Sequence, residues 1–380
     1  MKNYIKVKSK TDLSGFYVVY YGSTLNEKPG IYGISHLMEH LVCKGIDHLM
    51  GDFEKDGISW NAYTSDRDIV FFMTGLDEYV NKWKKKFYES ILNFNITEEQ
   101  FQNEKKIVLE EYTMSFNSQG ESHFLNLYRK IFNIFGPIGL KQDLKKLTLK
   151  DCQEYFKIQY TKPHKIIDVT KYNHTETEKF FESVEYSNTV VNKKFDYIKN
   201  GKFIFEKGND YKNESSIIDI TKIISEDLPI VEFICRMLSG GLKSPLVQEL
   251  REKRGLIYHV DCFLHEPIND AGIVIISMET TNKNRKKVQD IIQEVIENPR
   301  KYLTKKRFDI VYQYYEIKFR KEKESQHSAV NTFIYKTQSE LELKIFTGDI
   351  TYKKVLEVYE KYFNWKDFYK SVDIKEFEKI

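Results

Sequence analysis

The stretch GISHLMEHLVCKG, residues 33–45, is the part of the chain from which fold and chemistry are inferred. It places His36 and His40 four positions apart, with Glu39 directly before the second histidine, although the chain has only 9 histidines in 380 residues. Its apolar residues recur at helical spacing, which predicts an amphipathic helix. Because each helical residue turns by about 100°, the two imidazoles share one face, one turn apart.

Two histidines at this spacing can bind one metal ion, as they do on zinc-binding helices. Glu39 lies beside the same face, where a carboxylate can accept a proton from water at the metal. The order H-x-x-E-H reverses the familiar H-E-x-x-H and is the inverzincin signature. The alternative is a helix with two histidines in its core, and a catalytic zinc site would need a third protein ligand.

A candidate third ligand lies in NEKKIVLEEY, residues 103–112. Glu104 and Glu111 are seven positions apart and therefore share a helix face to within about 20°, whereas Glu110 is directed elsewhere. Periodicity shows only that Glu104 and Glu111 act together. A surface helix with ordinary acids has the same pattern, so the residues alone leave both interpretations open.

Two predicted helices begin with a capping motif. Thr97 with Gln100 forms a capping box before a helix predicted over residues 98–117. Thr148 with Asp151 is a similar start for a helix near residues 149–159.

The order of strands and helices indicates two α+β domains, since 380 residues exceed one ordinary core. ISWNAY (58–63) and RDIVFFMTG (67–75) predict a β-hairpin. We expect two similar domains, each a mixed, mostly antiparallel sheet packed with helices. They are an N-terminal metal-bearing domain over residues 1–188, a linker over 189–201, and a C-terminal domain over 202–380.

Composition excludes several classes of protein. The net charge is +3 with both signs interspersed, so no basic block indicates a nucleic-acid partner. No run of 18 apolar residues predicts a membrane span, and the N-terminus lacks a signal-peptide pattern. The four cysteines are far apart and form no C-x-x-C, which favours reduced thiols and a cytoplasmic location.

The histidine helix is one of five stretches whose order and spacing follow a known family. The others are WNAYTSDRDIVFF (60–72), EKKIVLEE (104–111), GPIGLKQDLKKLTLKDCQEYFKIQY (136–160) and LSGGLKSPLVQELREKRGLIYHV (238–260). In these stretches the chain resembles the insulinase/pitrilysin family of zinc peptidases. The resemblance is strongest to the family's shorter branch, which includes the mitochondrial processing peptidase, and it implies that branch's fold.

The resemblance implies a role for each residue of the metal site. His36, His40 and Glu111 would bind one Zn²⁺ per chain, and Glu39 would be the general base. Glu104 would support the site from behind the ligands by orienting one of them.

The resemblance also implies residues that bind the substrate. Asn61, Ala62 and Tyr63 would present a strand edge to an extended peptide. Arg251 would hold a substrate carbonyl, and Tyr258 would donate to the developing oxyanion. Arg254 competes for the arginine role, and an ordinary hairpin, a structural arginine and a core tyrosine remain the alternatives.

As a member of this family, the chain would be a zinc-dependent endopeptidase that hydrolyses short or unfolded peptides in an enclosed chamber. A chamber of four such domains requires a two-domain chain to pair, as a homodimer or as a heterodimer with a related chain. Maturation of a small precursor peptide is a narrower form of this hypothesis. The alternative is a non-catalytic scaffold or peptide-binding subunit of a hetero-oligomeric peptidase, although such subunits typically lose the zinc residues.

Overall fold

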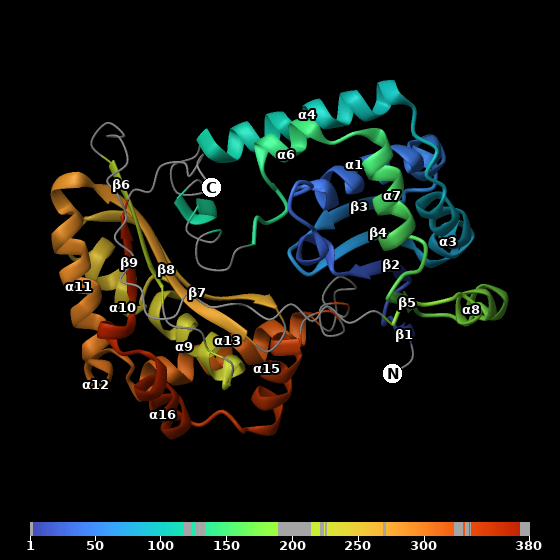
Figure 1. Cartoon of the computed structure of the whole chain (residues 1–380). Coiled ribbons are helices and arrows are strands. Elements are labelled where there is room, and N and C mark those ends of the chain that lie inside the picture. The colour runs from blue at the N-terminus through green and yellow to red at the C-terminus, as the bar shows by residue number, and fades with distance from the viewer. Residues whose placement is uncertain are drawn as a thin grey trace. The chain divides into compact units, whose positions relative to one another are not determined.

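The structure is a computed structural model with two compact units (Figure 1). It describes residues 3–117, 123–126, 129, 134–188, 214–220, 224, 226–268, 271–322, 330, 334 and 336–372. The first unit comprises the described parts of Met1–Ser115, Phe132–Asp196 and Glu322–Val330, and the second those of Phe116–Ile131, Tyr197–Lys321 and Asn331–Ile380. Among the helices in these ranges, none combines the length and apolar character that a bilayer crossing requires.

The first unit is built on a five-stranded sheet in the order β1-β5-β2-β4-β3. Its strands are β1 (Tyr4–Lys8), β2 (Leu13–Tyr21), β3 (Ser59–Thr64), β4 (Asp68–Leu76) and β5 (Lys165–Thr170). Strands β1 and β5 are parallel, and the other neighbours are antiparallel. Among the described strands β3 pairs only with β4, so β3 forms one edge of this sheet.

Seven helices of the first unit are described in full. They are α1 (Ile34–Ile46), α2 (Met50–Lys55), α3 (Asp77–Leu92), α4 (Glu98–Asn117), α6 (Lys141–Lys146), α7 (Leu149–Gln159) and α8 (Thr175–Glu182). Helix α1 packs against the edge strand β3 and against α3, and α3 packs against β2 and β4. Both predicted capping boxes are present, with Gln100 and Asp151 bonded back to Thr97 and Thr148.

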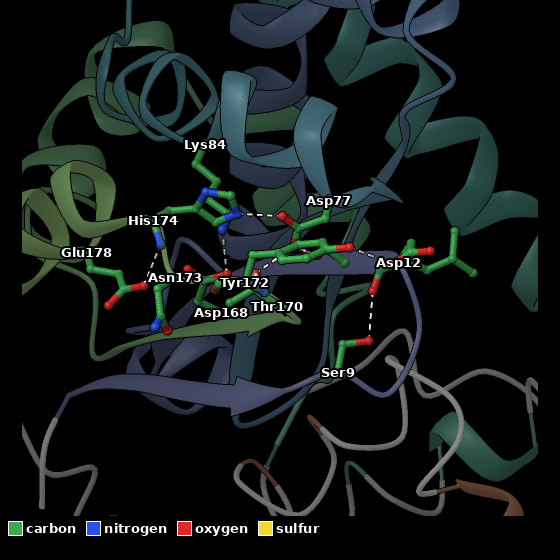
Figure 2. Close-up of polar contacts among 12 residues, drawn as sticks. Ser9, Asp12, Asp77, Lys84, Asp168, Thr170, Tyr172, Asn173, His174 and Glu178 are labelled. Atoms are coloured by element: carbon green, nitrogen blue, oxygen red, sulfur yellow. Dashed lines mark hydrogen bonds and ion pairs between the residues drawn. The ribbon is translucent and has the colours of Figure 1, made fainter.

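A largely buried polar cluster ties α3 to the sheet (Figure 2). Lys84 on α3 forms an ion pair of 2.7 Å with Asp168 on β5, and both side chains are buried. Asp77, the first residue of α3, accepts hydrogen bonds from Thr170 at 2.5 Å and from Ser14 and His174. Burial by itself would raise the pKa of Asp77, but these three hydrogen bonds outweigh it and hold the pKa below its usual value.

The second unit has a four-stranded antiparallel sheet in the order β7-β8-β6-β9. The strands are β6 (Glu214–Ile220), β7 (Ile257–Ile268), β8 (Ala271–Thr281) and β9 (Tyr369–Val372). The described helices are α9 (Leu228–Ser239), α10 (Pro245–Val247), α11 (Arg285–Glu297), α12 (Pro299–Tyr302), α13 (Lys305–Glu322), α15 (Lys336–Thr347) and α16 (Tyr352–Tyr362). Helix α9 packs on β7 and contributes Phe233, Ile234 and Leu238 to a single apolar core.

The α+β class with two domains, each a mostly antiparallel sheet packed with helices, is confirmed. The predicted hairpin is present as β3 and β4. Strand β1 near the N-terminus and strand β9 near the C-terminus were not predicted, because each is short and pairs with a distant segment. The predicted linker over residues 189–201 lies outside the described residues, so the domain boundaries stay a prediction.

Candidate metal centre

Helix α1 carries the histidines on the side that faces away from its core contacts. The buried face consists of Ile34, Leu37, Met38, Leu41 and Val42, at the spacing of an amphipathic helix. His36, Glu39 and His40 are only partly buried. Burial and the neighbouring His40 lower the pKa of His36 to about 4, so this imidazole is neutral at pH 7, as a metal ligand must be.

The start of α1 is held by the buried carboxyl group of Glu27, which no sequence pattern revealed. Burial raises the pKa of this group to about 8. Gly33 precedes the helix at φ 97°, and a Cβ there would lie 2.8 Å from the side chain of Leu144. The Glu27 side chain accepts hydrogen bonds from the backbone N–H of Gly33 at 2.9 Å and of Ser35 at 2.8 Å. These groups are N–H donors that the first turn of a helix leaves unpaired. No capping motif marks Glu27, because it reaches the helix from a preceding loop.

His36, His40 and Glu111 converge, and one ligand atom from each lies within 4.8 Å of the others. The Glu111 Oε2 lies 3.5 Å from His36 Nε2 and 3.8 Å from His40 Nε2. Two imidazole nitrogens and one carboxylate oxygen form a donor set that zinc accepts, and three protein ligands leave a position open. This is the only group of three such side chains found within the described residues.

Glu104 contacts the rear nitrogen of one of these histidines. Its Oε2 lies 3.2 Å from His40 Nδ1, and its side chain is almost fully buried. A carboxylate at Nδ1 favours the tautomer with the proton on that nitrogen, which leaves the Nε2 lone pair available to a metal. Lys44, which the sequence analysis did not single out, places its Nζ 3.5 Å from the other oxygen of Glu104. The competitor Glu110 is exposed and lies 3.9 Å from Lys106, so it is turned away from the histidines.

Glu39 lies between the histidines in sequence and contacts the edge strand in space. Its Oε2 accepts a hydrogen bond of 2.6 Å from the hydroxyl of Thr64, the last residue of β3. Burial raises the pKa of Glu39, and the hydrogen bond from Thr64 opposes that rise. Thr64 belongs to the stretch WNAYTSDRDIVFF (60–72), but only the tertiary structure reveals its contact with Glu39.

The three residues predicted to bind a peptide lie on β3, at the sheet edge beside α1. Ala62 is buried, Asn61 is exposed and Tyr63 is intermediate. The Asn61 carboxamide oxygen accepts a hydrogen bond of 2.9 Å from the backbone N–H of Ala62. The structure therefore brings this strand next to the histidine helix, while its substrate-binding role stays a prediction.

Arg251 and Tyr258 belong to the second unit. Arg251 lies in a wide helical turn over Gln248–Glu252, and its guanidinium carbon is 5.4 Å from the centre of the Tyr258 ring on β7. Tyr258 is 84% exposed, the most exposed large side chain among the described apolar and aromatic residues. Arg254 instead bonds to the carboxylate and backbone carbonyl of Glu249. This leaves Arg251 as the arginine whose head group is more available to a ligand.

Two family models match the chain. Residues 8–137 match the model described as "Insulinase (Peptidase family M16)", and residues 147–313 match the one described as "Peptidase M16 inactive domain". His36, Glu39, His40, Glu104 and Glu111 all fall within the first match.

Individual proteins similar to this chain are also named as peptidases. The "Zinc protease PqqE" of Helicobacter pylori is 28% identical over 43% of this chain and 39% of that protein. The "Probable mitochondrial-processing peptidase subunit beta, mitochondrial" of Arabidopsis thaliana is 27% identical over 36% of this chain and 27% of that protein. The match thus spans less than half the length of either relative. A solved structure described as "a protease from Helicobacter pylori" has a TM-score of 0.80 at 19% identity, over 97% of this chain and 96% of that chain, and shares the fold.

Proposed function

This chain belongs to the M16 (insulinase) family of peptidases, and from that membership we propose that it is a zinc-dependent endopeptidase acting on short or unfolded peptides. The observation that carries the proposal is the convergence of His36, His40 and Glu111, whose ligand atoms lie within 4.8 Å of one another. Two imidazoles and a carboxylate suit Zn²⁺ and leave one position for substrate or water. Relatives named zinc proteases support the same metal.

Zinc held by these three residues would supply Lewis-acid chemistry, which makes water more acidic and polarises a peptide carbonyl. Glu39 accepts the proton of the attacking water and delivers it to the leaving amine, since a carboxylate can serve as base and then as acid. Glu104 fixes the ring of His40 through its Nδ1 contact of 3.2 Å. The geometry of the ligands is thereby set before the substrate arrives.

The substrate lies along β3 as an added strand. Asn61, Ala62 and Tyr63 supply main-chain hydrogen bonds, which recognise an extended backbone and not a particular side chain. Tyr258 donates to the oxyanion of the tetrahedral intermediate, and Arg251 holds a substrate carbonyl. An extended backbone is available in short or unfolded peptides, which is why we propose these as the substrate class. Maturation of a small precursor peptide is a narrower case of the same activity.

We further propose that the chain works as a pair in the cytoplasm, as a homodimer or with a related chain. A relative named as a subunit beta supports assembly with a second chain. Both half-sites, the zinc residues and the Arg251–Tyr258 pair, are present in this one sequence, which favours a homodimer with sites completed across subunits. Mixing Glu39→Gln protein with Arg251→Ala protein tests this. Recovered activity supports shared sites, and none after proven subunit exchange contradicts them.

The central experiment is hydrolysis of a quenched-fluorescent peptide library by the purified chain and by its Glu39→Gln variant, with zinc content measured for both. We expect cleavage by the native chain and its loss in the variant at unchanged zinc content. Zinc in both proteins with cleavage by neither contradicts an autonomous peptidase.

A second candidate is a non-catalytic, peptide-binding subunit. The description "inactive domain" for the model that matches residues 147–313 favours it, although that match does not include the zinc residues. Binding of peptides without cleavage, together with no zinc uptake, is the result expected for such a subunit.

A further inference from the structure

The carboxylate of Glu39 has a single hydrogen-bond partner among the described residues. The Thr64 hydroxyl donates to Oε2 at 2.6 Å, whereas Oε1 receives no hydrogen bond from any described residue. A short hydrogen bond between a hydroxyl and a carboxylate is a strong one. One oxygen is therefore held by the protein while the other is free to meet a proton donor.

The group that holds Glu39 comes from the sheet edge and not from α1. Alternate residues of a strand point to opposite faces, so Ala62 and Thr64 share a face and Asn61 lies on the other. Ala62 is buried and Asn61 is exposed, and α1 packs against β3. The shared face of Ala62 and Thr64 is therefore the one that meets α1. Thr64 spans from the strand to the helix at the end of β3.

From these contacts we infer that Thr64 is a positioning residue for Glu39, the general base. Thr64 thereby links the peptide-binding strand to the proton-transfer step. The inference rests on the proposed function for its catalytic meaning. A glutamate side chain has three rotatable bonds, and its rotamers cost entropy to order. A hydrogen bond from a rigid strand removes that freedom in advance, as proton transfer over a short distance requires.

The bond also survives the reaction. When Oε1 accepts a proton, Oε2 keeps its lone pairs and continues to accept from Thr64. Glu39 is thus held in the same place as base and as acid. A peptide added to β3 lies on the strand that fixes Glu39, so binding and catalysis share one rigid element.

The test compares Thr64→Val, which keeps the shape and removes the hydroxyl, with Thr64→Ser, which keeps the hydroxyl. Thr74→Val on β4 is the matched control, because Thr74 donates only a long bond of 3.5 Å to a backbone carbonyl. We expect Thr64→Val to lower kcat by roughly tenfold to a hundredfold. KM should stay within about twofold, because ground-state binding is unchanged. Thr64→Ser should recover most of the rate, and Thr74→Val should match the native chain, all at equal zinc content.

Crystal structures of the zinc-loaded native chain and both Thr64 variants give a second readout that does not depend on turnover. We expect an ordered Glu39 carboxylate in the native chain and in Thr64→Ser, and a displaced or disordered one in Thr64→Val. Native kcat in Thr64→Val, or an undisturbed Glu39 in its structure, overturns the inference. If the native chain cleaves no peptide, the proposed function fails, while the Glu39 position still decides whether Thr64 holds it.

Discussion

Removal of the buried carboxyl group of Glu27 should loosen the helix that carries His36 and His40. Glu27 accepts the backbone N–H of Gly33 at 2.9 Å and of Ser35 at 2.8 Å, at the start of α1. The change Glu27→Ala leaves both donors buried without an acceptor. His36 lies in the first turn of the helix, so this damage reaches a metal ligand.

The expected loss of stability follows from the two backbone hydrogen bonds that Glu27 accepts. An orphaned buried N–H costs about 1–3 kcal/mol, so Glu27→Ala should lower the free energy of unfolding by about 2–6 kcal/mol. The change Glu27→Gln keeps one carbonyl oxygen, which can accept one of the two hydrogen bonds, so about half of that loss is expected. Loss of charge adds little at pH 7, because burial raises the pKa of Glu27 to about 8. Each 1.4 kcal/mol that the metal must supply to reorder the first turn weakens zinc affinity about tenfold.

The assay is urea denaturation of the zinc-free chain, followed by far-UV circular dichroism, with zinc affinity measured by competition with a fluorescent chelator. Glu54→Ala is the control, since Glu54 is an exposed glutamate on α2 and should change stability by less than about 0.5 kcal/mol. A loss below about 1 kcal/mol in Glu27→Ala, or zinc affinity equal to that of the native chain, would refute the reasoning.

Three further outcomes are expected. Glu104→Gln should weaken zinc binding about tenfold to a hundredfold in a chelator competition, because His40 loses its charged partner, and Glu110→Gln, on the exposed face of the same helix, should leave it unchanged. Zinc at about 100 times its Kd should stabilise the native chain by about 2.7 kcal/mol in thermal unfolding, and His40→Ala should abolish that gain. Asp77→Asn should cost about 2 kcal/mol at pH 7. The pKa of Asp77 is depressed in the folded chain, so its contribution is present above about pH 4 and is lost as the pH falls further. The free energy of unfolding, measured by urea denaturation, should therefore fall less steeply from pH 7 to pH 3 in Asp77→Asn than in the native chain. Parallel curves for the two proteins would contradict this.

Local spacing determined much of the fold. The amphipathic pattern of residues 33–45 predicted α1 and placed both histidines on one face, because side chains one turn apart on a helix are neighbours whatever surrounds them. Two strand-like runs in residues 58–75, joined by a short polar turn, predicted the hairpin of β3 and β4. The strand β1 escaped prediction, since its partner β5 lies far along the chain and nothing local encodes a parallel pairing.

The metal centre likewise has features that the sequence predicted and features that only the tertiary structure decided. The sequence determined that Glu104 and Glu111 act from one face of a helix, but periodicity treats two residues seven apart as equivalent. Only the tertiary structure separates them, since it places Glu111 near both Nε2 atoms and Glu104 at Nδ1 of His40. The contacts of Glu27 and Thr64 are likewise tertiary, because each joins a loop or strand to a helix across space. Such contacts depend on how the elements pack, which the spacing of residues within one element does not specify.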